Sequence, residues 1–405
     1  MAVKVLLATT VRWPSAARLA GAFVAAGCAV DALLPADHPA SHSRYFSDIF
    51  GYRPFADLSS LRHAIARAQP ELIVTLDDRA TALLLRAHAS GTAELRALIE
   101  RSLGNVEHYP LLMSRSGFIG AAQQAAIRTP KTRAIRNRDD LDEALAEIGY
   151  PALLKTDGTW GGDGVTIVRT TEQAHAAFHR HCDPPSLLRG LLRAVRRSDG
   201  HHLRTALEAK KPAISLQAFV AGNPATTSFA CWQGKLLACN HLQTLAAREA
   251  HGPASVLKRI ENPTMDQAAA RLATRFGLSG LHGLDYIRDE AGNAHLIEIN
   301  PRSPQSSYLS FGAGHDLVSS LVSRLDGRAH APRPRVPGDV VALFPQEWMR
   351  DPASPHLTQA FHDVPWDDPA LIRAWMESGL ARPALEKWRA FMAGTPDGHR
   401  VAAEA

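Results

Sequence analysis

The alternation of apolar and polar residues along the chain first predicts strands and helices that follow one another in turn. Near the N-terminus the expected elements are strands at 3–10, 29–34 and 71–76 and helices at about 15–27 and 58–68. Strands and helices that alternate at this length are typical of a small parallel α/β unit. The first strand-to-helix turn, Thr9–Arg12, lacks G-x-G-x-x-G, so dinucleotide binding is not assigned there.

The middle of the chain mixes helices with strands that favour antiparallel pairing. The expected helices are 111–127, 141–148 and 265–276, and the expected strands are 152–154, 165–168, 213–220, 226–232 and 235–239. Arg115 lies one turn into the first of these helices, where an ordinary exposed arginine is the simplest interpretation. Residues 184–211 are helical in pattern and basic, which predicts a solvated insertion, with a lid or a surface for an acidic partner as the alternative.

A glycine-rich loop follows a buried-type strand that ends in a lysine. The strand Ala152–Leu154 leads to Lys155, and the loop Asp157–Gly164 carries four glycines before the next strand. Lysine is rarely buried, and glycines let backbone amides approach a polyanion without obstruction by Cβ. We therefore expect Lys155 and this loop to bind phosphates. The alternative is a plain glycine-rich hairpin, and the Walker pattern G-x-x-x-x-G-K-[ST] is absent.

A second hairpin, GLDYIRDEAGNAHLIEINPR from Gly283 to Arg302, places acids opposite each other. Two apolar runs flank the turn formers Asp289–Asn293, so Asp285 should face Glu298, with Asn300 on the same face. Facing Cβ atoms lie roughly 5 Å apart, where like charges are destabilising unless they are neutralised. Two carboxylates and an amide oxygen suit a hard divalent cation. The alternative is a solvated hairpin whose acids happen to face each other.

The opposite face of this hairpin is apolar. We expect Leu284, Tyr286, Ile297 and Ile299 to anchor the hairpin in a core. One face would then be fixed by packing while the other presents oxygen ligands.

Composition narrows the class of protein. The 405 residues are 45% hydrophobic and 21% charged, with a formal net charge of +5, as in ordinary globular proteins of two or three domains. The four cysteines and 19 histidines show no metal-ligand spacing, which predicts reduced cytosolic thiols. No apolar run reaches the roughly 18–20 residues that span a bilayer, and the first residues read as a strand rather than a targeting segment. A cytoplasmic protein is expected.

Taken in order, these features resemble the ATP-grasp superfamily, especially the branch of carbamoyl-phosphate synthase and biotin carboxylase. The resemblance spans about residues 111–325. It rests on the helix arginine, the strand lysine, the glycine-rich loop, the strand ending Q-A-F-V-x-G and the D-x12-E-x-N-P-R hairpin. The resemblance implies an α/β and α+β architecture: a Rossmann-like domain at 1–105, an ATP-grasp domain at 106–328 and a small C-terminal module at 329–405. Within the ATP-grasp domain it implies a subdomain with the glycine-rich loop at about 128–220 and a metal-binding subdomain at about 221–328.

The resemblance also implies roles for individual residues. ATP would be bound by Arg115, Lys155, Gly161, Gly162, Gly164, Gln217, Ala218 and Val220. Asp285, Glu298 and Asn300 match ligands of Mg²⁺ or Mn²⁺, and Lys155 and Arg302 would be catalytic, with Arg302 orienting an acyl phosphate or its carboxylate. His251 would at most assist proton transfer, and a loop histidine without a role is the simpler interpretation.

The resemblance predicts an ADP-forming ligase that joins a small carboxylate to an amine through an acyl phosphate. The chain has Gln217 where relatives have an acid, and Gln305 where the carbamoyl-phosphate synthase pattern has arginine, which disfavours bicarbonate as substrate. The alternatives are a bicarbonate-using carboxylase or carbamoyl-type enzyme acting through carboxyphosphate, and a non-catalytic ATP-binding protein. Neither nucleic acid nor a membrane is an expected partner; a homodimer is compatible with these residues, which do not fix the oligomeric state.

Overall fold

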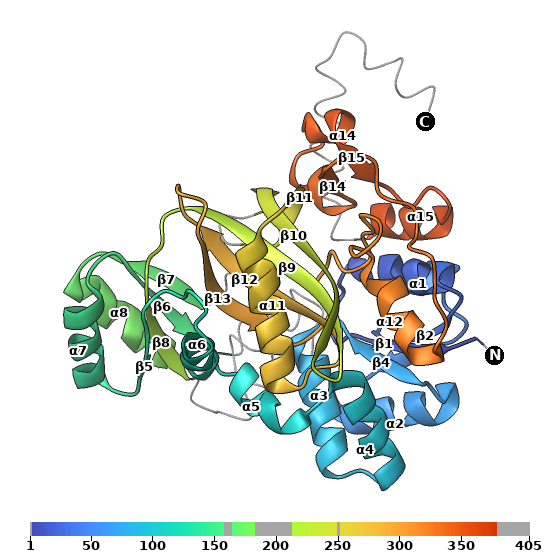
Figure 1. Cartoon of the computed structure of the whole chain (residues 1–405), viewed down its shortest axis with the longest axis horizontal. Helices are drawn as coiled ribbons and strands as arrows, with labels where there is room; N and C mark the ends of the chain where they lie inside the picture. Colours follow the sequence, from blue (N-terminus) through green and yellow to red (C-terminus); the bar gives the residue numbers. More distant parts are fainter. Residues whose placement is uncertain (1, 158–163, 183–212, 249–251, 379–405) are drawn as a thin grey trace.

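The computed structural model describes residues 2–157, 164–182, 213–248 and 252–378, and the described residues form three β-sheets (Figure 1). The basic segment 184–211, Gly161, Gly162 and His251 lie outside the described residues. Among the helices that are described, none combines the length and the apolar character needed to cross a bilayer.

The N-terminal sheet is parallel, with strand order β3-β2-β1-β4. Its strands are β1 Lys4–Ala8, β2 Ala29–Pro35, β3 Ile49–Tyr52 and β4 Leu72–Thr75. Its helices are α1 Ser15–Ala25, α2 Asp57–Ala68, α3 Asp78–Ala89 and α4 Ala93–Leu103. Apolar residues of α1 join one core cluster and those of α2, α3 and α4 join another, so helices cover both faces of the sheet. The predicted parallel α/β unit is confirmed.

Three elements of this unit were missed from the sequence. Strand β3 is short and half-exposed, so it lacks the buried apolar run that marks its neighbours. Helices α3 and α4 are amphipathic and begin at side-chain caps, Asp77 and Thr92, each of which accepts a hydrogen bond from a backbone amide of its first turn.

A second, antiparallel sheet has the order β5-β8-β6-β7. Its strands are β5 Thr132–Ile135, β6 Ala152–Thr156, β7 Val165–Val168 and β8 Ile214–Ala218. Helices α7 Arg138–Ile148 and α8 Thr171–Cys182 supply apolar residues to its core. The strand expected at 213–220 ends at Ala218, and residues 219–222 lead from this sheet to the next.

The third sheet has seven strands in the order β13-β12-β9-β10-β11-β14-β15. The strands are β9 Asn223–Trp232, β10 Lys235–Ala247, β11 Ala254–Ile260, β12 Gly280–Arg288, β13 Ala294–Asn300, β14 Val340–Leu343 and β15 Phe361–Asp363. Helix α11 Pro263–Phe276 crosses one face, as Figure 1 shows, and α12 Leu317–Asp326 packs into the other core cluster. The sequence pattern also predicts a loop at 251–255, but Ala254 and Ser255 lie in β11.

The C-terminal residues join this sheet and also contact the N-terminal unit. Strand β14 pairs with β11, which adds β14 and β15 to the sheet edge. The short helices of this C-terminal part are α13 Gln346–Arg350, α14 His356–Gln359 and α15 Pro369–Glu377. Asp363 at the end of β15 accepts hydrogen bonds from Arg18 and Tyr308, and Trp375 is buried. The domain boundaries given above stay predictions.

Candidate active site

The hairpin formed by β12 and β13 has the predicted register where it carries its polar residues. Asp285 pairs with Glu298, and Gly283 pairs with Asn300. Asn300 lies on the same face as the two acids, because its Nδ2 donates a hydrogen bond of 2.7 Å to Asp285 Oδ2. Two carboxylates and one amide therefore lie together on one face of the seven-stranded sheet.

The apolar face differs from the prediction at one position. A β-bulge between Asp285 and Tyr286 makes Tyr286 pair with Leu296 rather than Ile297. Leu296 is consequently buried in the core with Leu284, Tyr286 and Ile299, whereas Ile297 is half-buried. The predicted core role of Ile297 is wrong, because one extra residue in a strand moves the residues beyond it to the other face.

The negative charge of Asp285 is energetically unfavourable in this arrangement. Burial raises the pKa of Asp285, and the nearby charge of Glu298 raises it further. The hydrogen bond from Asn300 opposes these effects without reversing them. A divalent cation on this face would remove the cost, so the charges fit a metal site.

Arg115 reaches this acidic face from a helix that begins at that residue. The single helix expected at 111–127 is wrong: α5 Tyr109–Leu112 ends, and α6 Arg115–Gln124 starts with Ser114 as its N-cap. Serine caps helices by accepting from a backbone amide, here that of Gly117. Apolar periodicity continues through the break, which explains why the pattern suggested one helix with Arg115 a turn inside it.

The contacts of Arg115 join two of the sheets. Its Nε donates to Glu298 Oε2 at 3.2 Å, and its guanidinium also donates to the carbonyl oxygen of Thr156 at the end of β6. The backbone amide of Arg115 donates to Asp157 Oδ2 at 3.3 Å. Arg115 thus connects the acidic hairpin to the strand that carries Lys155.

Lys155 is buried near the end of β6, as the sequence suggested. The residue is 6% exposed, and its Nζ donates to Gln217 Oε1 at 2.7 Å. Burial lowers the pKa of Lys155 to about 8; Glu298 opposes this shift and Arg115 adds to it. Gln217 donates in turn to Thr132 Oγ1 at 3.0 Å, so both side chains are held in place.

Two segments start close to Lys155: the glycine-rich loop, and the link that leads from β8 to β9. The amide of Thr156 donates to the carbonyl of Gly164, whose positive φ of 76° favours glycine. Ala218 is the last residue of β8, and Val220 lies two residues further along the link to β9, half-buried. Gly164, Gln217 and Lys155 are therefore close in the fold.

Arg302 lies on the other side of the acidic face, where the N-terminal unit contacts the hairpin. Its Nη2 donates to Asn300 Oδ1 at 2.9 Å, and its Nε donates to Asp78 Oδ1 at 3.2 Å. The amide of Ser303 donates to the Thr75 carbonyl, and Thr81 Oγ1 donates to the Pro301 carbonyl. The segment after β13 is thus fastened to the carboxyl end of β4.

Asp78 is a site residue that sequence reasoning missed. It is the first residue of α3, and burial raises the pKa of its carboxyl group. The available signal was Asp77-Asp78 directly after a buried strand, because ligands of parallel sheets bind at the carboxyl ends of strands. Asp77 has a structural role, since it accepts hydrogen bonds from Thr9 and Thr10.

The oxygen of Asn300 already has a partner in this arrangement. Its Oδ1 accepts from Arg302 while its Nδ2 faces Asp285. Coordination through Oδ1 would therefore require the amide to turn and release Arg302. The two acids also have partners in this arrangement, since Asp285 accepts from Asn300 and Glu298 accepts from Arg115.

Two protein-family models match the chain. The model of the carbamoyl-phosphate synthase L chain, ATP binding domain, matches residues 114–184, and a model described as ATP-grasp domain matches residues 195–306. A curated relative is the carbamoyl phosphate synthase large chain of Rubrobacter xylanophilus, 22% identical over 269 residues. That match covers 66% of this chain and 24% of the relative, so the chain spans about a quarter of the relative's length.

Solved structures with a similar fold bind adenine nucleotides. One is the ADP complex of an N5-carboxyaminoimidazole ribonucleotide synthetase, with a TM-score of 0.57 and 14% identity over 82% of this chain and 79% of that one. Another is the biotin carboxylase domain dimer of the Hydrogenobacter thermophilus 2-oxoglutarate carboxylase with MgADP, ADP and bicarbonate. Its TM-score is 0.55 and its identity 15%, over 82% and 71% of the two chains. The predicted fold class, α/β and α+β with a Rossmann-like first domain, is confirmed.

Proposed function

The chain belongs to the ATP-grasp superfamily, and from that premise we propose that it is an ATP- and Mg²⁺-dependent, ADP-forming ligase that joins a carboxylate to an amine. The observation that carries the proposal is that Arg115 and Arg302 contact one acidic face while the buried Lys155 interacts electrostatically with its two acids. These residues come from three separate parts of the fold.

In the proposed reaction, a carboxylate oxygen of the substrate attacks the γ-phosphorus of ATP. The bond from that phosphorus to the bridging oxygen breaks, and ADP leaves. The amine nitrogen then attacks the acyl carbon, the bond to the phosphate oxygen breaks, and phosphate leaves while the amine loses a proton. Mg²⁺, or Mn²⁺ in its place, would be held by Asp285, Glu298 and Asn300 and would neutralise charge on the phosphates.

The side chains of this chain supply position and positive charge. Lys155 lies near the end of β6 and Arg115 contacts that end from α6, where the phosphates would meet the amides of the loop that ends at Gly164. Gln217, Ala218 and Val220 would hold adenine along the link between sheets, mostly through backbone groups. Arg302 would orient the acyl phosphate, since a planar guanidinium can donate two parallel hydrogen bonds to a carboxylate or phosphate.

The surroundings of Gln305 favour an organic carboxylate over bicarbonate. Gln305 Nε2 donates to the Ala254 carbonyl at 3.0 Å, and Gln346 Nε2 donates to Gln305 Oε1 at 3.4 Å. Gln305 and both of its partners are uncharged, so this position supplies no second cation for a small anion. Among the proposals, a bicarbonate-using reaction through carboxyphosphate therefore ranks second.

The experiment is a phosphate-release screen of the full chain with Mg²⁺ and ATP, crossing carboxylic acids with amino acids. One arm contains bicarbonate and no organic acid. We expect phosphate and ADP to appear only when both an acid and an amine are present. Release with bicarbonate alone would favour the carboxyphosphate reaction, and no release in any arm would favour a non-catalytic ATP-binding protein.

Glu298→Ala tests the metal assignment within that screen. We expect turnover to fall by at least about a hundredfold, the effect of removing one charge-stabilising group from a catalytic site. Glu290→Ala is the matched control, because Glu290 lies exposed in the turn of the same hairpin. Retained turnover in a folded Glu298→Ala protein would reject the assignment.

A cytoplasmic location and a homodimer remain proposals. Analytical ultracentrifugation of the purified chain measures the second directly.

A further inference from the structure

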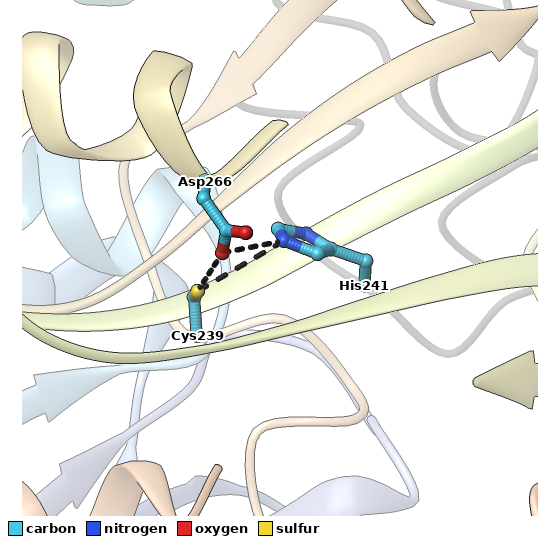
Figure 2. Close-up of side chains that lie close together, drawn as sticks. All are labelled: Cys239, His241 and Asp266. Carbon is cyan, nitrogen blue, oxygen red and sulfur yellow. Dashed lines mark hydrogen bonds and ion pairs between the residues drawn. The ribbon is translucent and has the colours of Figure 1, made fainter. Parts of the chain in front are cut away.

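A second cluster of potential ligands lies on the other face of the seven-stranded sheet, away from the acidic hairpin face. It contains Cys239 and His241 of β10 and Asp266 of α11 (Figure 2). His241 pairs with Thr227, and Thr227 follows Thr226, which pairs with Asp285. Neighbouring residues of a strand point to opposite faces, so the cluster and Asp285 lie on opposite sides of the sheet.

The three side chains point toward one another, as Figure 2 shows. Asp266 Oδ1 lies 2.9 Å from Cys239 Sγ and 2.9 Å from His241 Nε2, and the sulfur lies 4.0 Å from that nitrogen. Cys239 and His241 are 6% and 4% exposed, whereas the side chain of Asp266 is 49% exposed. The two strand residues are therefore fixed by packing, and the carboxylate has room to move.

We propose that Cys239, His241 and Asp266 form a binding site for a zinc-type divalent cation, with a fourth position open to water beside Asp266. A thiolate, an imidazole and a carboxylate are the ligand types of tetrahedral Zn²⁺, and the thiolate disfavours Mg²⁺, Ca²⁺ and Mn²⁺. In tetrahedral zinc sites the ligand atoms lie about 3.4–3.6 Å apart, from bond lengths of about 2.0–2.3 Å. Each of the three observed separations would change by less than about 1 Å to reach that geometry.

Thr227 supports the imidazole in the form that such a site needs. Its Oγ1 lies 2.8 Å from His241 Nδ1. A threonine hydroxyl both donates and accepts, so it can take the proton of Nδ1 while the lone pair of Nε2 faces the cation. A hydrogen-bonded second nitrogen is typical of histidines that bind metals.

Binding would replace the proton that now links the thiol to the carboxylate. The S–H bond of Cys239 breaks, a bond from sulfur to the cation forms, and the proton leaves to solvent on the exposed side of Asp266. Burial raises the pKa of the Cys239 thiol, so the cation and not the environment must supply the driving force. Burial also lowers the pKa of His241, which keeps the imidazole neutral and its lone pair available.

The cation would fasten α11 to β10. Asp266 lies in the first turn of α11, whose apolar residues pack in the core with Leu284, Tyr286 and Leu296. The opposite face of that hairpin carries the two acids of the proposed active site. A metal at the cluster would therefore stabilise the support beneath the active site without touching a substrate.

The competing interpretation is a metal-free hydrogen-bond network that joins the helix to the strand. Cobalt distinguishes the two, because a thiolate bound to Co²⁺ gives a charge-transfer band in the near ultraviolet and hydrogen bonding does not. The full chain, treated with chelator, is titrated with Co²⁺ and then with Zn²⁺ in competition. We expect one equivalent of Co²⁺ per chain to produce the band and Zn²⁺ to abolish it.

Variants assign the band to the cluster. Cys239→Ser should abolish it, Asp266→Asn should weaken binding, and Thr227→Val should cost about 10–100-fold in affinity, as for other residues that orient a ligand. Cys231→Ala is the matched control, since Cys231 is a buried thiol of the adjacent strand β9 whose sulfur lies near the Gly280 carbonyl. It should keep the band.

Several outcomes would overturn the proposal. They are the absence of the band in the unmodified chain, an undiminished band in Cys239→Ser, or cobalt binding without a sulfur signature. If Cys239→Ser does not fold by circular dichroism, Asp266→Asn decides instead, because its half-exposed side chain tolerates the change. These readouts do not depend on ligase turnover, so failure of the proposed function leaves the test intact.

Discussion

Replacing Asp285 by Asn should stabilise the metal-free protein while removing its proposed cation site. Asp285 is half-buried, faces Glu298 and has a raised pKa, so its negative charge works against folding when no cation is present. Asparagine has nearly the same shape, and its Oδ1 can still accept the hydrogen bond that Asn300 donates at 2.7 Å. The variant therefore removes the charge with little loss of packing.

The size of the effect follows from the register of the hairpin. Facing side chains carry charges roughly 5 Å apart, and at an effective dielectric constant of about 20 they repel by about 3 kcal/mol. Glu298 is 28% exposed and pairs with Arg115 at 3.2 Å, and both circumstances reduce the repulsion. We expect about 1–2 kcal/mol of added stability in Asp285→Asn after this screening.

Urea unfolding in the presence of a chelator measures that free energy. Asp289→Asn is the control, because Asp289 in the turn of the same hairpin accepts hydrogen bonds from Asn293 and His295 and should lose stability on substitution. With Mg²⁺ and ATP added, the unmodified chain should gain stability and Asp285→Asn should not. A metal-free Asp285→Asn protein less stable than the parent would show that Asp285 is a structural acid and would refute the metal assignment.

Further predictions concern the cations around the acidic face. Asp78→Asn should lower kcat about tenfold with little change in KM for ATP, because Arg302 loses one charged partner and keeps Asn300. Steady-state kinetics measures the two constants separately. The pKa of Lys155 is about 8, so the Kd of the nucleotide-free protein for ATP should rise about tenfold per pH unit above that value, as calorimetry would show. Since the folded pKa lies below the unfolded value, the contribution of Lys155 to stability rises with pH between about 8 and 10.5. Gln217→Glu should raise the pH at which ATP binding begins to weaken, because a carboxylate 2.7 Å from Nζ favours the ammonium form. An unchanged pH would mean that another group titrates.

Much of the candidate site follows from local patterns in the sequence. The turn formers Asp289–Asn293 centre the hairpin, and the period of two then places Asp285 opposite Glu298. The same pattern could not reveal the bulge, which places Leu296 rather than Ile297 in the core. Both residues are apolar and neighbouring, so hydrophobicity does not say where the extra residue lies.

Other features depend on contacts between residues far apart in the chain. The ion pair between Asp78 and Arg302 joins positions 224 residues apart, and no periodicity of either segment encodes it. Cys239, His241 and Asp266 likewise show no metal-ligand spacing in the sequence, because a helix supplies the third ligand. The end of α5 before Ser114 is a different case, in which a cap interrupts an apolar pattern that continues on both sides.

The two arginines beside the acidic face explain why its charge is only partly balanced. Arg115 bonds to Glu298, and Arg302 bonds to Asn300 and Asp78, so each guanidinium is directed to a neighbour of Asp285. The charge of Arg302 lowers the pKa of Asp285, yet burial and Glu298 outweigh it. A face balanced in this way holds its acids in place without a cation and leaves one carboxylate whose charge the proposed cation would neutralise. Binding of that cation and folding of the hairpin would then be coupled through Asp285, which is why its substitution should move stability and cation binding in opposite directions.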